Sequence, residues 1–415
     1  MPQSSCATSQ VSLGPGQPIY PLSPALVEGC PQTANKEINY PVEVSYDYAS
    51  LDKSIFDQAA QPGIDRWQAL LPPLLNGLSM GEGGTPLTLL PGDIANKDVG
   101  GKIHFKNESL NPTFSHKDRL NVCTISAAKA SGAEGVVVAS SGNHGVSAAA
   151  YAARAGLKCL LITAPEISDS FREMLQSYGA LCVATSIDNR WPMMREVVAK
   201  VGYHPVSNLT DSHTGHAWGP EGYKTISYEL YAQLGKRAPS VVVVPTGYGE
   251  QLYGIHKGFC ELKLLGLIDK LPKIISVEPE ERGPLHHAFT NDKLFSEVTA
   301  GPTRQLSIAC TVGGYRGIKV LKESGGSALK ADDRAVEQAR SKLGKQGFWM
   351  EFSGATGVAA LSQLSEEDLA GHVVVLGCAP GFKDPAKAHK QLKELQPQFA
   401  DLKSYIKQEY GASIG

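Results

Sequence analysis

One lysine, Lys117, stands between a polar turn and the start of a predicted helix. Residues Ser109–Arg119 read SLNPTFSHKDR, and the Asn, Pro, Thr and Ser residues before the lysine are typical of turns and helix caps. The stretch Asp118–Ala130 favours a helix. Because a helix start attracts anions, a free ammonium is poorly placed there. An amine held as a Schiff base to an aldehyde would remove that conflict, whereas the simpler alternative is a surface lysine.

A second motif, SSGNHG at 140–145, follows an apolar run and precedes an alanine-rich stretch. Small residues at a helix start let backbone N–H groups approach an anion, and Asn143 offers an amide to an oxygen. The motif therefore indicates a site for a carboxylate or a phosphate. An ordinary helix N-cap would use the same residue types.

Two further turns follow valine-rich runs. PTGYGE at 245–250 has glycines that expose backbone amides, as a phosphate-binding turn does. It is not a dinucleotide fingerprint, because Leu252 stands at the third glycine position, and Glu250 is an unusual neighbour for a phosphate. CAPGFKD at 378–384 begins with Cys378, whose thiol could face a ring nitrogen or be buried and inert. Either turn, taken alone, could be purely structural.

The elements that must position these turns alternate between strand and helix. Strands are predicted at 135–140, 159–163, 181–185, 241–244, 274–277 and 373–376, and helices at 146–155, 168–178 and 251–265. Such alternation predicts βαβ units and a parallel sheet, and thus an α/β fold. Ligands of open α/β sheets bind beyond the carboxyl ends of the strands, where the three turns lie. Residues 1–45 show no clear period, and we expect an extension that wraps the body or an oligomer partner.

Composition narrows the class of protein. The chain has 415 residues, enough for two lobes, and its net charge of −2 gives no reason to expect nucleic acid or an anionic membrane as partner. No apolar run approaches the roughly 18–20 residues of a membrane span, and the first ten residues lack a secretory signal. The eight cysteines form no zinc pattern, which predicts no metal site and a reducing cytoplasm. Cys159 and Cys182 are expected to be buried.

In their order and spacing, these elements resemble the fold-type II pyridoxal phosphate enzymes of the tryptophan synthase β-like superfamily, and threonine synthase most of all. The family pattern Gly-Glu-Gly-x-Thr-Pro-Leu stands at Gly81–Leu87, and Asn-Pro-Thr-x-Ser-Phe-Lys-Asp-Arg stands at Asn111–Arg119 with His116 in place of Phe. Ser-Ser-Gly-Asn stands at Ser140–Asn143, and Gly-Leu-Lys-Asp-Pro at Gly381–Pro385 with Phe382 in place of Leu. The resemblance runs from Gly81 to Pro385.

The resemblance implies two lobes, each with a mostly parallel twisted sheet flanked by helices. A large cofactor-binding domain would comprise 46–119 and 226–415, a smaller inserted α/β domain 120–225, and an N-terminal extension 1–45. The implied cofactor is pyridoxal 5′-phosphate.

Residue roles follow from the same resemblance. Lys117 would be the catalytic Schiff-base lysine, Asn143 would bond the phenolic oxygen of the cofactor, and Cys378 would lie opposite its ring nitrogen. The cofactor phosphate would be held by a turn comprising Gly247, Tyr248, Gly249, Glu250 and Gln251. The substrate would be bound by Thr85, Ser140, Ser141, Gly142 and His144. No metal is implied.

The implied activity is a lyase or synthase reaction on an amino acid with a β- or γ-leaving group, as when threonine synthase converts O-phosphohomoserine to threonine and phosphate. The active-site motifs depart from that family, since threonine synthases usually carry Thr where His144 and Cys378 stand and Gly-Asn-Ala-Gly-Asn at 247–251. A β-replacement synthase of the cysteate synthase kind and a threonine or serine deaminase therefore remain alternatives. A non-catalytic nucleotide-binding protein is the alternative from another class. We expect a cytoplasmic homodimer acting on a small amino acid.

Overall fold

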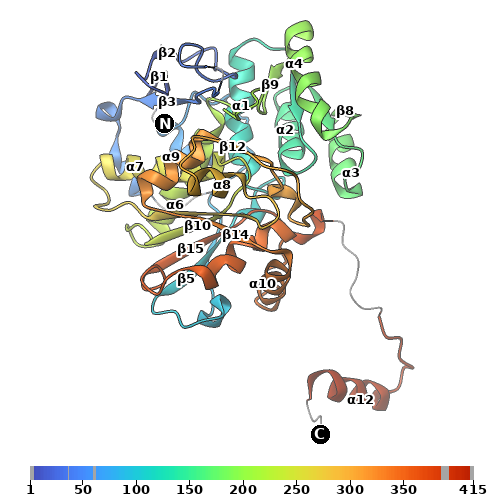
Figure 1. Ribbon diagram of the computed structural model, residues 1–415. Coiled ribbons are helices and arrows are strands. Elements are labelled where there is room, and N and C mark those ends of the chain that lie inside the picture. Colours follow the sequence, from blue (N-terminus) through green and yellow to red (C-terminus); the bar gives the residue numbers. More distant parts are fainter. Residues whose placement is uncertain (1–3, 36, 59–61, 385–391, 412–415) are drawn as a thin grey trace. The chain divides into compact units, whose positions relative to one another are not determined.

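The computed structural model describes residues 4–35, 37–58, 62–384 and 392–411 (Figure 1). Contacts divide the chain into two compact units, 1–384 and 385–415. The second unit contains α12 (Phe399–Tyr410), which has no buried residue. All elements that carry the predicted site belong to the first unit.

The larger sheet has six strands in the order β14-β11-β10-β15-β5-β4, of which only β4 is antiparallel. Continuous apolar runs such as VVVV form its centre because both faces of a parallel sheet are covered. Val242 lies between Ile274 and Val374 on the neighbouring strands. The strands are β4 (Leu87–Leu89), β5 (Lys102–Asn107), β10 (Val241–Pro245), β11 (Lys273–Pro279), β14 (Ala328–Ala331) and β15 (His372–Gly377).

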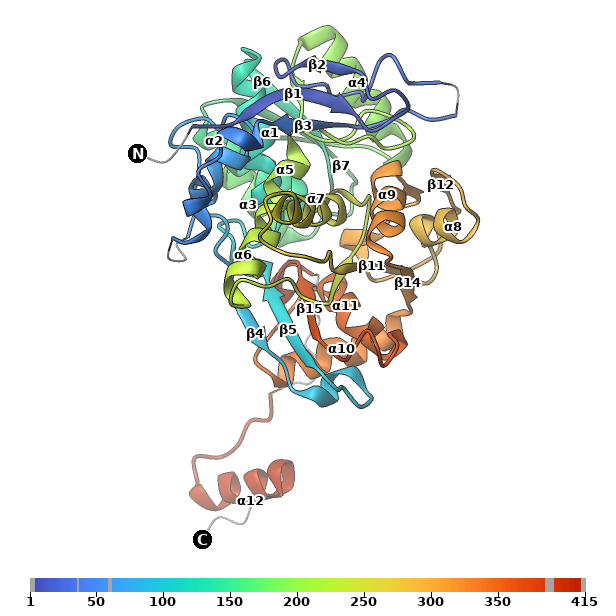
Figure 2. The same cartoon turned by 90° about the vertical axis from the view of Figure 1, so that its left-hand side faces the viewer.

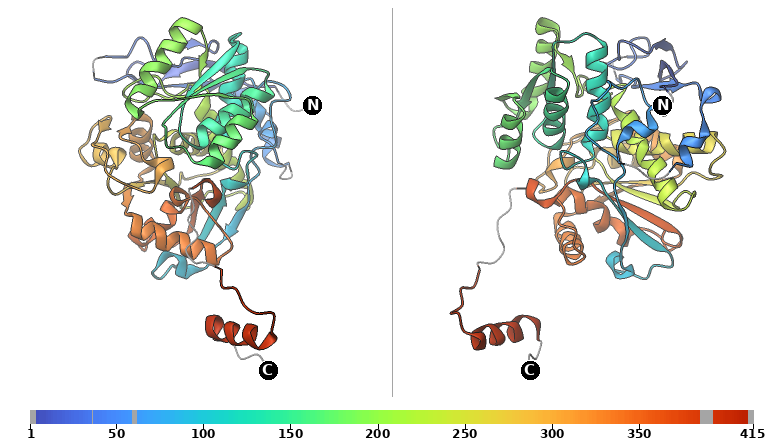
Figure 3. Two further views of the ribbon diagram at one scale, coloured as in Figure 1. Left: turned by 90° about the vertical axis from the view of Figure 1, so that its right-hand side faces the viewer. Right: turned by 180° about the vertical axis from the view of Figure 1, so that it is seen from behind.

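The smaller sheet has four parallel strands in the order β8-β7-β6-β9 (Figure 3, left, green and turquoise). Its strands are β6 (Gly135–Ala139), β7 (Lys158–Thr163), β8 (Leu181–Ala184) and β9 (His204–Pro205), and its helices are α1 (Lys117–Ala130), α2 (Asn143–Arg154), α3 (Asp169–Ser177) and α4 (Arg190–Val201). The α/β fold with two mostly parallel sheets flanked by helices is thus confirmed. The domain boundaries at 119/120 and 225/226 stay a prediction. Cys159 is buried as expected, but the expectation for Cys182 is wrong, because it lies exposed on the edge strand β8.

The remaining elements surround the larger sheet or join the sheets (Figures 1 and 2). They are α5 (Gly219–Tyr223), α6 (Thr225–Gln233), α7 (Glu250–Leu264), α8 (Pro284–Thr290), α9 (Tyr315–Ser324), α10 (Asp333–Lys345), α11 (Thr356–Ala359) and the short pair β12 (Ser296–Glu297) and β13 (Val312–Gly313). In the described ranges, no helix is long and apolar enough to cross a membrane.

The N-terminal segment, for which the sequence shows no period, forms a three-stranded antiparallel sheet in the order β2-β1-β3 (Figure 2). Its strands are β1 (Ala7–Ser12), β2 (Ile19–Pro21) and β3 (Val42–Tyr46). Alternation is hidden in β1 because the buried positions Gln10 and Ser12 are polar. The Gln10 amide is satisfied there by donating to the carbonyls of Pro21 and Pro24 at 2.7 and 2.9 Å.

Candidate active site

The loop before Lys117 is held in place by the buried carboxylate of Asp118. That carboxylate accepts hydrogen bonds from the Thr113 backbone N–H at 2.7 Å and from Ser147 Oγ at 2.6 Å. Burial raises the pKa of Asp118 to about 6, although these hydrogen bonds oppose the shift. Because Ser147 belongs to α2, the same carboxylate brings the loop beside the helix that begins with Asn143.

Lys117 is the first residue of α1, and its amine donates to the hydroxyl of Tyr223 at 3.1 Å. Tyr223 is the last residue of α5 and is fully buried. Burial, followed by the negative charge of Glu250, raises the pKa of Tyr223 well above its usual value, so the phenol stays neutral. Sequence reasoning did not identify Tyr223, since a tyrosine more than a hundred residues from the lysine carries no local signal.

The charge of Lys117 acts on residues of all three predicted turns. Burial and then this charge lower the pKa of His144 to about 4. Burial raises the pKa of the Cys378 thiol, with a further increase from Glu351, and Lys117 opposes the shift. Burial would raise the pKa of Glu250, but the charges of His213 and Lys117 hold it below its usual value. Direct contacts agree with these effects, because the His116 N–H donates to the Cys378 carbonyl and the Asn121 amide of α1 donates to the His144 carbonyl, both at 3.4 Å.

The turn between β10 and α7 has a shape that only small residues allow. Gly249 has φ +87°, in the left-handed region, and a Cβ on Gly247 would lie 3.1 Å from the sulfur of Cys310. In the first turn of α7, the Gln251 Nε2 atom is buried and has no hydrogen-bond partner among the described residues. An unpaired donor at a helix start is suited to an anion.

Tyr248 and Glu250 of this turn face a loop that sequence reasoning did not include. The Tyr248 ring stacks on His213 with centroids 4.0 Å apart and planes at 9°. The Glu250 carboxylate packs against Gly215, where a Cβ would overlap it. Since Glu250 keeps a lowered pKa, it contributes negative charge at the start of α7.

The hydroxyls of the turn at 140–144 are engaged within the protein. Ser140 Oγ accepts from the Gly145 N–H at 3.1 Å, and Ser141 Oγ accepts from Arg190 at 2.9 Å. His144 donates from Nε2 to the Val206 carbonyl at 3.0 Å, so the neutral ring leaves Nδ1 as an acceptor. Gly142 is the N-cap of α2 and is half-buried. Substrate binding by these residues stays a prediction.

Thr85 lies in a buried ion-pair network behind the lysine loop. Its hydroxyl donates to Glu108 at 2.5 Å, and Arg119 bonds both Glu108 and Glu229 at 2.6–2.9 Å. Lys106 adds a fourth charge through a 2.6 Å pair with Glu229. A role for Thr85 in substrate binding stays a prediction, and in this structure its hydroxyl supports the fold.

Asn143 belongs to a second buried network, which sequence reasoning missed in part. Its Nδ2 donates to Glu351 at 3.1 Å, and its Oδ1 accepts from Lys383 at 2.7 Å. Burial, followed by the charge of Asp384, raises the pKa of Glu351 to about 7, while burial lowers that of Lys383 to about 8. Lys383 belongs to the Gly381–Pro385 motif, so the sequence could have indicated it as a site residue. No motif of the sequence includes Glu351.

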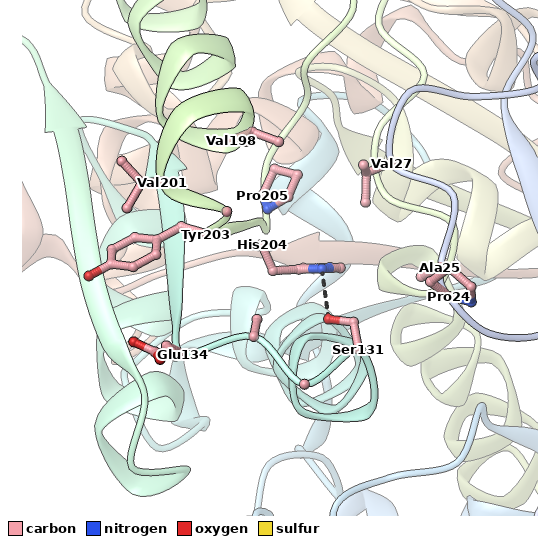
Figure 4. A pocket seen from close by; sticks show the side chains of 13 residues that line it. Pro24, Ala25, Val27, Ser131, Glu134, Val198, Val201, Tyr203, His204 and Pro205 are labelled. Carbon is pink, nitrogen blue, oxygen red and sulfur yellow. Dashed lines mark hydrogen bonds between the residues drawn. The ribbon is translucent and has the colours of Figure 1, made fainter.

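A cavity of about 470 Å³ lies away from these turns (Figure 4). Residues of the N-terminal segment, the end of α1, the end of α4 and β9 line it, with the His204 imidazole bonded to Ser131 at 3.4 Å. None of the predicted site residues lines this cavity. Across the described residues, no group of three or more His, Cys, Asp or Glu could hold a metal ion.

The amide of Asn143 follows a strand of the smaller sheet, and the glycine turn and Cys378 follow strands of the larger sheet. Together with the lysine at the start of α1, this arrangement is that of the fold-type II pyridoxal phosphate enzymes. The sequence profile described as "Pyridoxal-phosphate dependent enzyme" matches residues 78–379, and the chain belongs to this family. Its cofactor is pyridoxal 5′-phosphate.

Within this family, the chain is similar in sequence to several threonine synthases. The threonine synthase of Methanocaldococcus jannaschii is 29% identical over 370 residues, covering 85% of this chain and 89% of the relative. That of a Synechocystis species is 31% identical over 310 residues, covering 73% and 78%. The resemblance to threonine synthase drawn from the motifs is thereby confirmed.

Solved structures share the fold at lower identity. Maize serine racemase aligns with a TM-score of 0.61 and 20% identity, covering 72% of this chain and 88% of that one. The processed form of threonine deaminase isoform 2 from Solanum lycopersicum aligns with a TM-score of 0.60 and 18% identity, covering 72% and 84%. These structures establish the fold alone.

Proposed function

We propose that the chain is a carbon–oxygen lyase or synthase that acts on an amino acid with a β- or γ-leaving group, in the manner of threonine synthase. The observation that carries this proposal is that α1 and the residue before it contact two of the predicted turns, since the His116 N–H donates to the Cys378 carbonyl and the Asn121 amide to the His144 carbonyl, both at 3.4 Å. The charge of Lys117 acts on Glu250 of the third turn. The family match favours this enzyme over the non-catalytic nucleotide-binding alternative.

The residues present fit the cofactor, and we assign them as follows. The unpaired Gln251 amide and the backbone N–H groups at the start of α7, with the turn Gly247–Glu250, would hold its phosphate. Asn143 would donate to its phenolic oxygen, and the buried thiol of Cys378 would face its ring nitrogen. When bound, pyridoxal phosphate supplies an electron sink for a carbanion at the substrate Cα.

Protein groups would then handle protons and charge. The Lys117 amine would remove the Cα proton and return one later, with the Tyr223 hydroxyl as its hydrogen-bond partner in both states. Because the pKa of Cys378 is raised, a neutral thiol would face the ring and limit protonation of its nitrogen. This favours elimination and replacement over transamination. His144, Thr85, Ser140, Ser141 and Gly142 would contact the substrate.

Among substrates, O-phosphohomoserine is our first candidate because the two relatives named above are threonine synthases. The second candidate is a β-replacement or deamination reaction. His144 favours it, since this neutral imidazole stands where threonine synthases usually carry a hydroxyl. The cytoplasmic location and the homodimer remain proposals.

The test is incubation of the holoenzyme with O-phosphohomoserine, O-phosphoserine, threonine or serine, with identification of the products by mass spectrometry. We expect threonine and phosphate from O-phosphohomoserine. A 2-oxo acid from threonine or serine, with no product from O-phosphohomoserine, would assign the deaminase alternative. Lack of turnover on all four substrates would contradict the proposal.

A further inference from the structure

Lys383, in the short helical turn after β15, is a cation in an unusual place. Its side chain is 1% exposed, and its amine donates to the Thr113 carbonyl and to Asn143 Oδ1, both at 2.7 Å. Burying an ammonium costs several kcal/mol unless it is paired and hydrogen-bonded. The carboxylates of Glu351 and Asp118 act on it without a direct ion pair. A neutral donor could bond the Thr113 carbonyl equally well. The presence of a buried ammonium at this position therefore needs another reason.

The hydrogen bonds of Lys383 fix which way the Asn143 amide points. An ammonium has only donors, so the atom of Asn143 that faces it is the oxygen. The opposite side of the same amide meets acceptors, because Nδ2 lies 3.1 Å from Glu351 and 3.4 Å from Ser307 Oγ. A flipped amide would place NH₂ against an ammonium and an oxygen against a carboxylate. The ammonium of Lys383 therefore determines the orientation, and the acceptors on the opposite side are compatible with it.

Asn143 in this orientation presents a nitrogen donor. One N–H of the amide serves Glu351, and the other points toward Ser307 Oγ at 3.4 Å, a long contact that a closer acceptor would replace. If the amide could flip, its oxygen and not its nitrogen would face that acceptor. The two oxygens would repel each other, and one hydrogen bond would be lost.

We propose that Lys383 is a positioning residue that holds the Asn143 amide with its nitrogen toward the phenolic oxygen of the cofactor. The proposal rests on the proposed function, which assigns that oxygen to Asn143. Lys383 acts through Asn143 and does not itself contact the cofactor.

The test uses the absorbance of the purified holoenzyme, which reports the ionisation of the phenolic oxygen without any substrate. The measured quantity is the ratio of the visible to the near-ultraviolet cofactor band in the wild type, Lys383→Met, Lys383→Arg, Asn143→Ala and the double variant Lys383→Met/Asn143→Ala. We expect Lys383→Met to lower the ratio about two- to tenfold, as loss of one hydrogen bond would, and Lys383→Arg to restore most of it. In the Asn143→Ala background, Lys383→Met should add no further change.

A wild-type ratio in Lys383→Met, or an equal shift in the Asn143→Ala background, would overturn the inference. If Lys383→Met does not fold by circular dichroism, Lys383→Arg decides. A ratio like that of Asn143→Ala in this donor-retaining variant would then contradict the positioning role, and a wild-type ratio would support it. A wild type with no cofactor band at all would instead contradict the proposed function.

Discussion

At the scale of single residues, Lys117 depends on a neutral partner. The Tyr223 hydroxyl can accept from an ammonium or donate to a neutral amine, and its raised pKa keeps the proton in place over the working pH range. A carboxylate in this position would have fixed the amine in its charged form. A buried phenol therefore suits a lysine that must change its protonation state.

Replacement of Tyr223 by Phe should lower kcat/KM by about ten- to a hundredfold, at or below the lower end of what direct proton transfer contributes, because Tyr223 only supports the amine that transfers the proton. Cofactor affinity should stay near that of the wild type, because the phosphate and ring contacts lie on other elements. Steady-state kinetics and cofactor titration would measure the two effects. Tyr228→Phe is the matched control, since it removes a buried hydroxyl that bonds Glu261 instead of Lys117. Equal kinetic losses in both variants would remove the special role of Tyr223.

At the scale of elements, the turn Gly247–Gln251 is the part whose backbone geometry matters most. Sequence reasoning identified it by its glycines alone, and the structure supplies the reason: a positive φ at Gly249 and a close approach to Cys310 at Gly247. Such conformations cost about 1–2 kcal/mol for a residue with a Cβ. A side chain at Gly249 would therefore distort the backbone whose N–H groups are proposed to bind the cofactor phosphate.

We expect Gly249→Ala to weaken cofactor binding about tenfold and to lower the stability of the apoprotein by about 1 kcal/mol. Fluorescence titration with pyridoxal phosphate and urea unfolding are the measurements. Gly344→Ala, in the open face of α10, is the control and should be neutral or slightly stabilising, because a Cβ there meets nothing within 4 Å. Cofactor affinity of Gly249→Ala equal to that of this control would show that the turn does not hold the phosphate.

The contact between β9 and the end of α1 predicts a pH effect on stability. The backbone N–H of Trp218 donates to His216 Nδ1, so His216 carries its proton on Nε2 and donates to His204 Nε2 at 3.0 Å. His204 therefore carries its proton on Nδ1, which faces Ser131 Oγ. Burial lowers the pKa of His204 to about 4, against about 6.5 when unfolded. Between these values the unfolded state binds more protons, so stability falls as the pH drops from 6.5 to 4.

Between pH 7 and pH 4, the free energy of unfolding of His204→Gln should fall by about 2–3 kcal/mol less than that of the wild type. Urea unfolding at a series of pH values measures this difference. His144 and His213, whose pKa values burial also lowers to about 4, would keep part of the slope in the variant. An unchanged slope in His204→Gln would mean that this histidine does not titrate on unfolding.

At the scale of the whole molecule, buried charges join the N-terminal sheet to the helices that carry Tyr223. Glu221 of α5 accepts from the Tyr46 hydroxyl of β3 at 2.9 Å and pairs with Lys224 and Lys257 at 2.9 and 2.7 Å. These interactions hold the pKa of Glu221 at about 2 despite its burial. The N-terminal strands are therefore built into the body of the enzyme.

Glu221→Gln should cost about 3–5 kcal/mol of unfolding free energy, because it leaves two buried ammonium groups short of a counter-charge. Urea unfolding of the apoprotein would measure this loss. Glu196→Gln, which removes one partner of an exposed pair on α4, is the control and should change stability by less than about 0.5 kcal/mol. A loss in Glu221→Gln as small as in this control would show that the network does not stabilise the fold.

Sequence reasoning reached those parts of the molecule that local patterns encode. Apolar runs and glycine turns predicted three strands of each sheet and the ends where the site lies, because burial and turn geometry depend on neighbouring residues. The strands β4, β5, β9 and β14 were not predicted. Sequence reasoning missed the N-terminal sheet, whose buried Gln10 and Ser12 hide the alternation. It also missed Glu351 and Tyr223, which meet Asn143 and Lys117 only after folding, across more than a hundred positions.

The central claim is that Lys117, and no other lysine, bonds covalently to the cofactor. The most direct measurement is borohydride reduction of the holoenzyme followed by peptide mass spectrometry. We predict a pyridoxyl group on the peptide containing Lys117 and its loss in Lys117→Ala. A label on Lys383, the buried lysine that bonds Asn143, or no label on any lysine, would contradict the account.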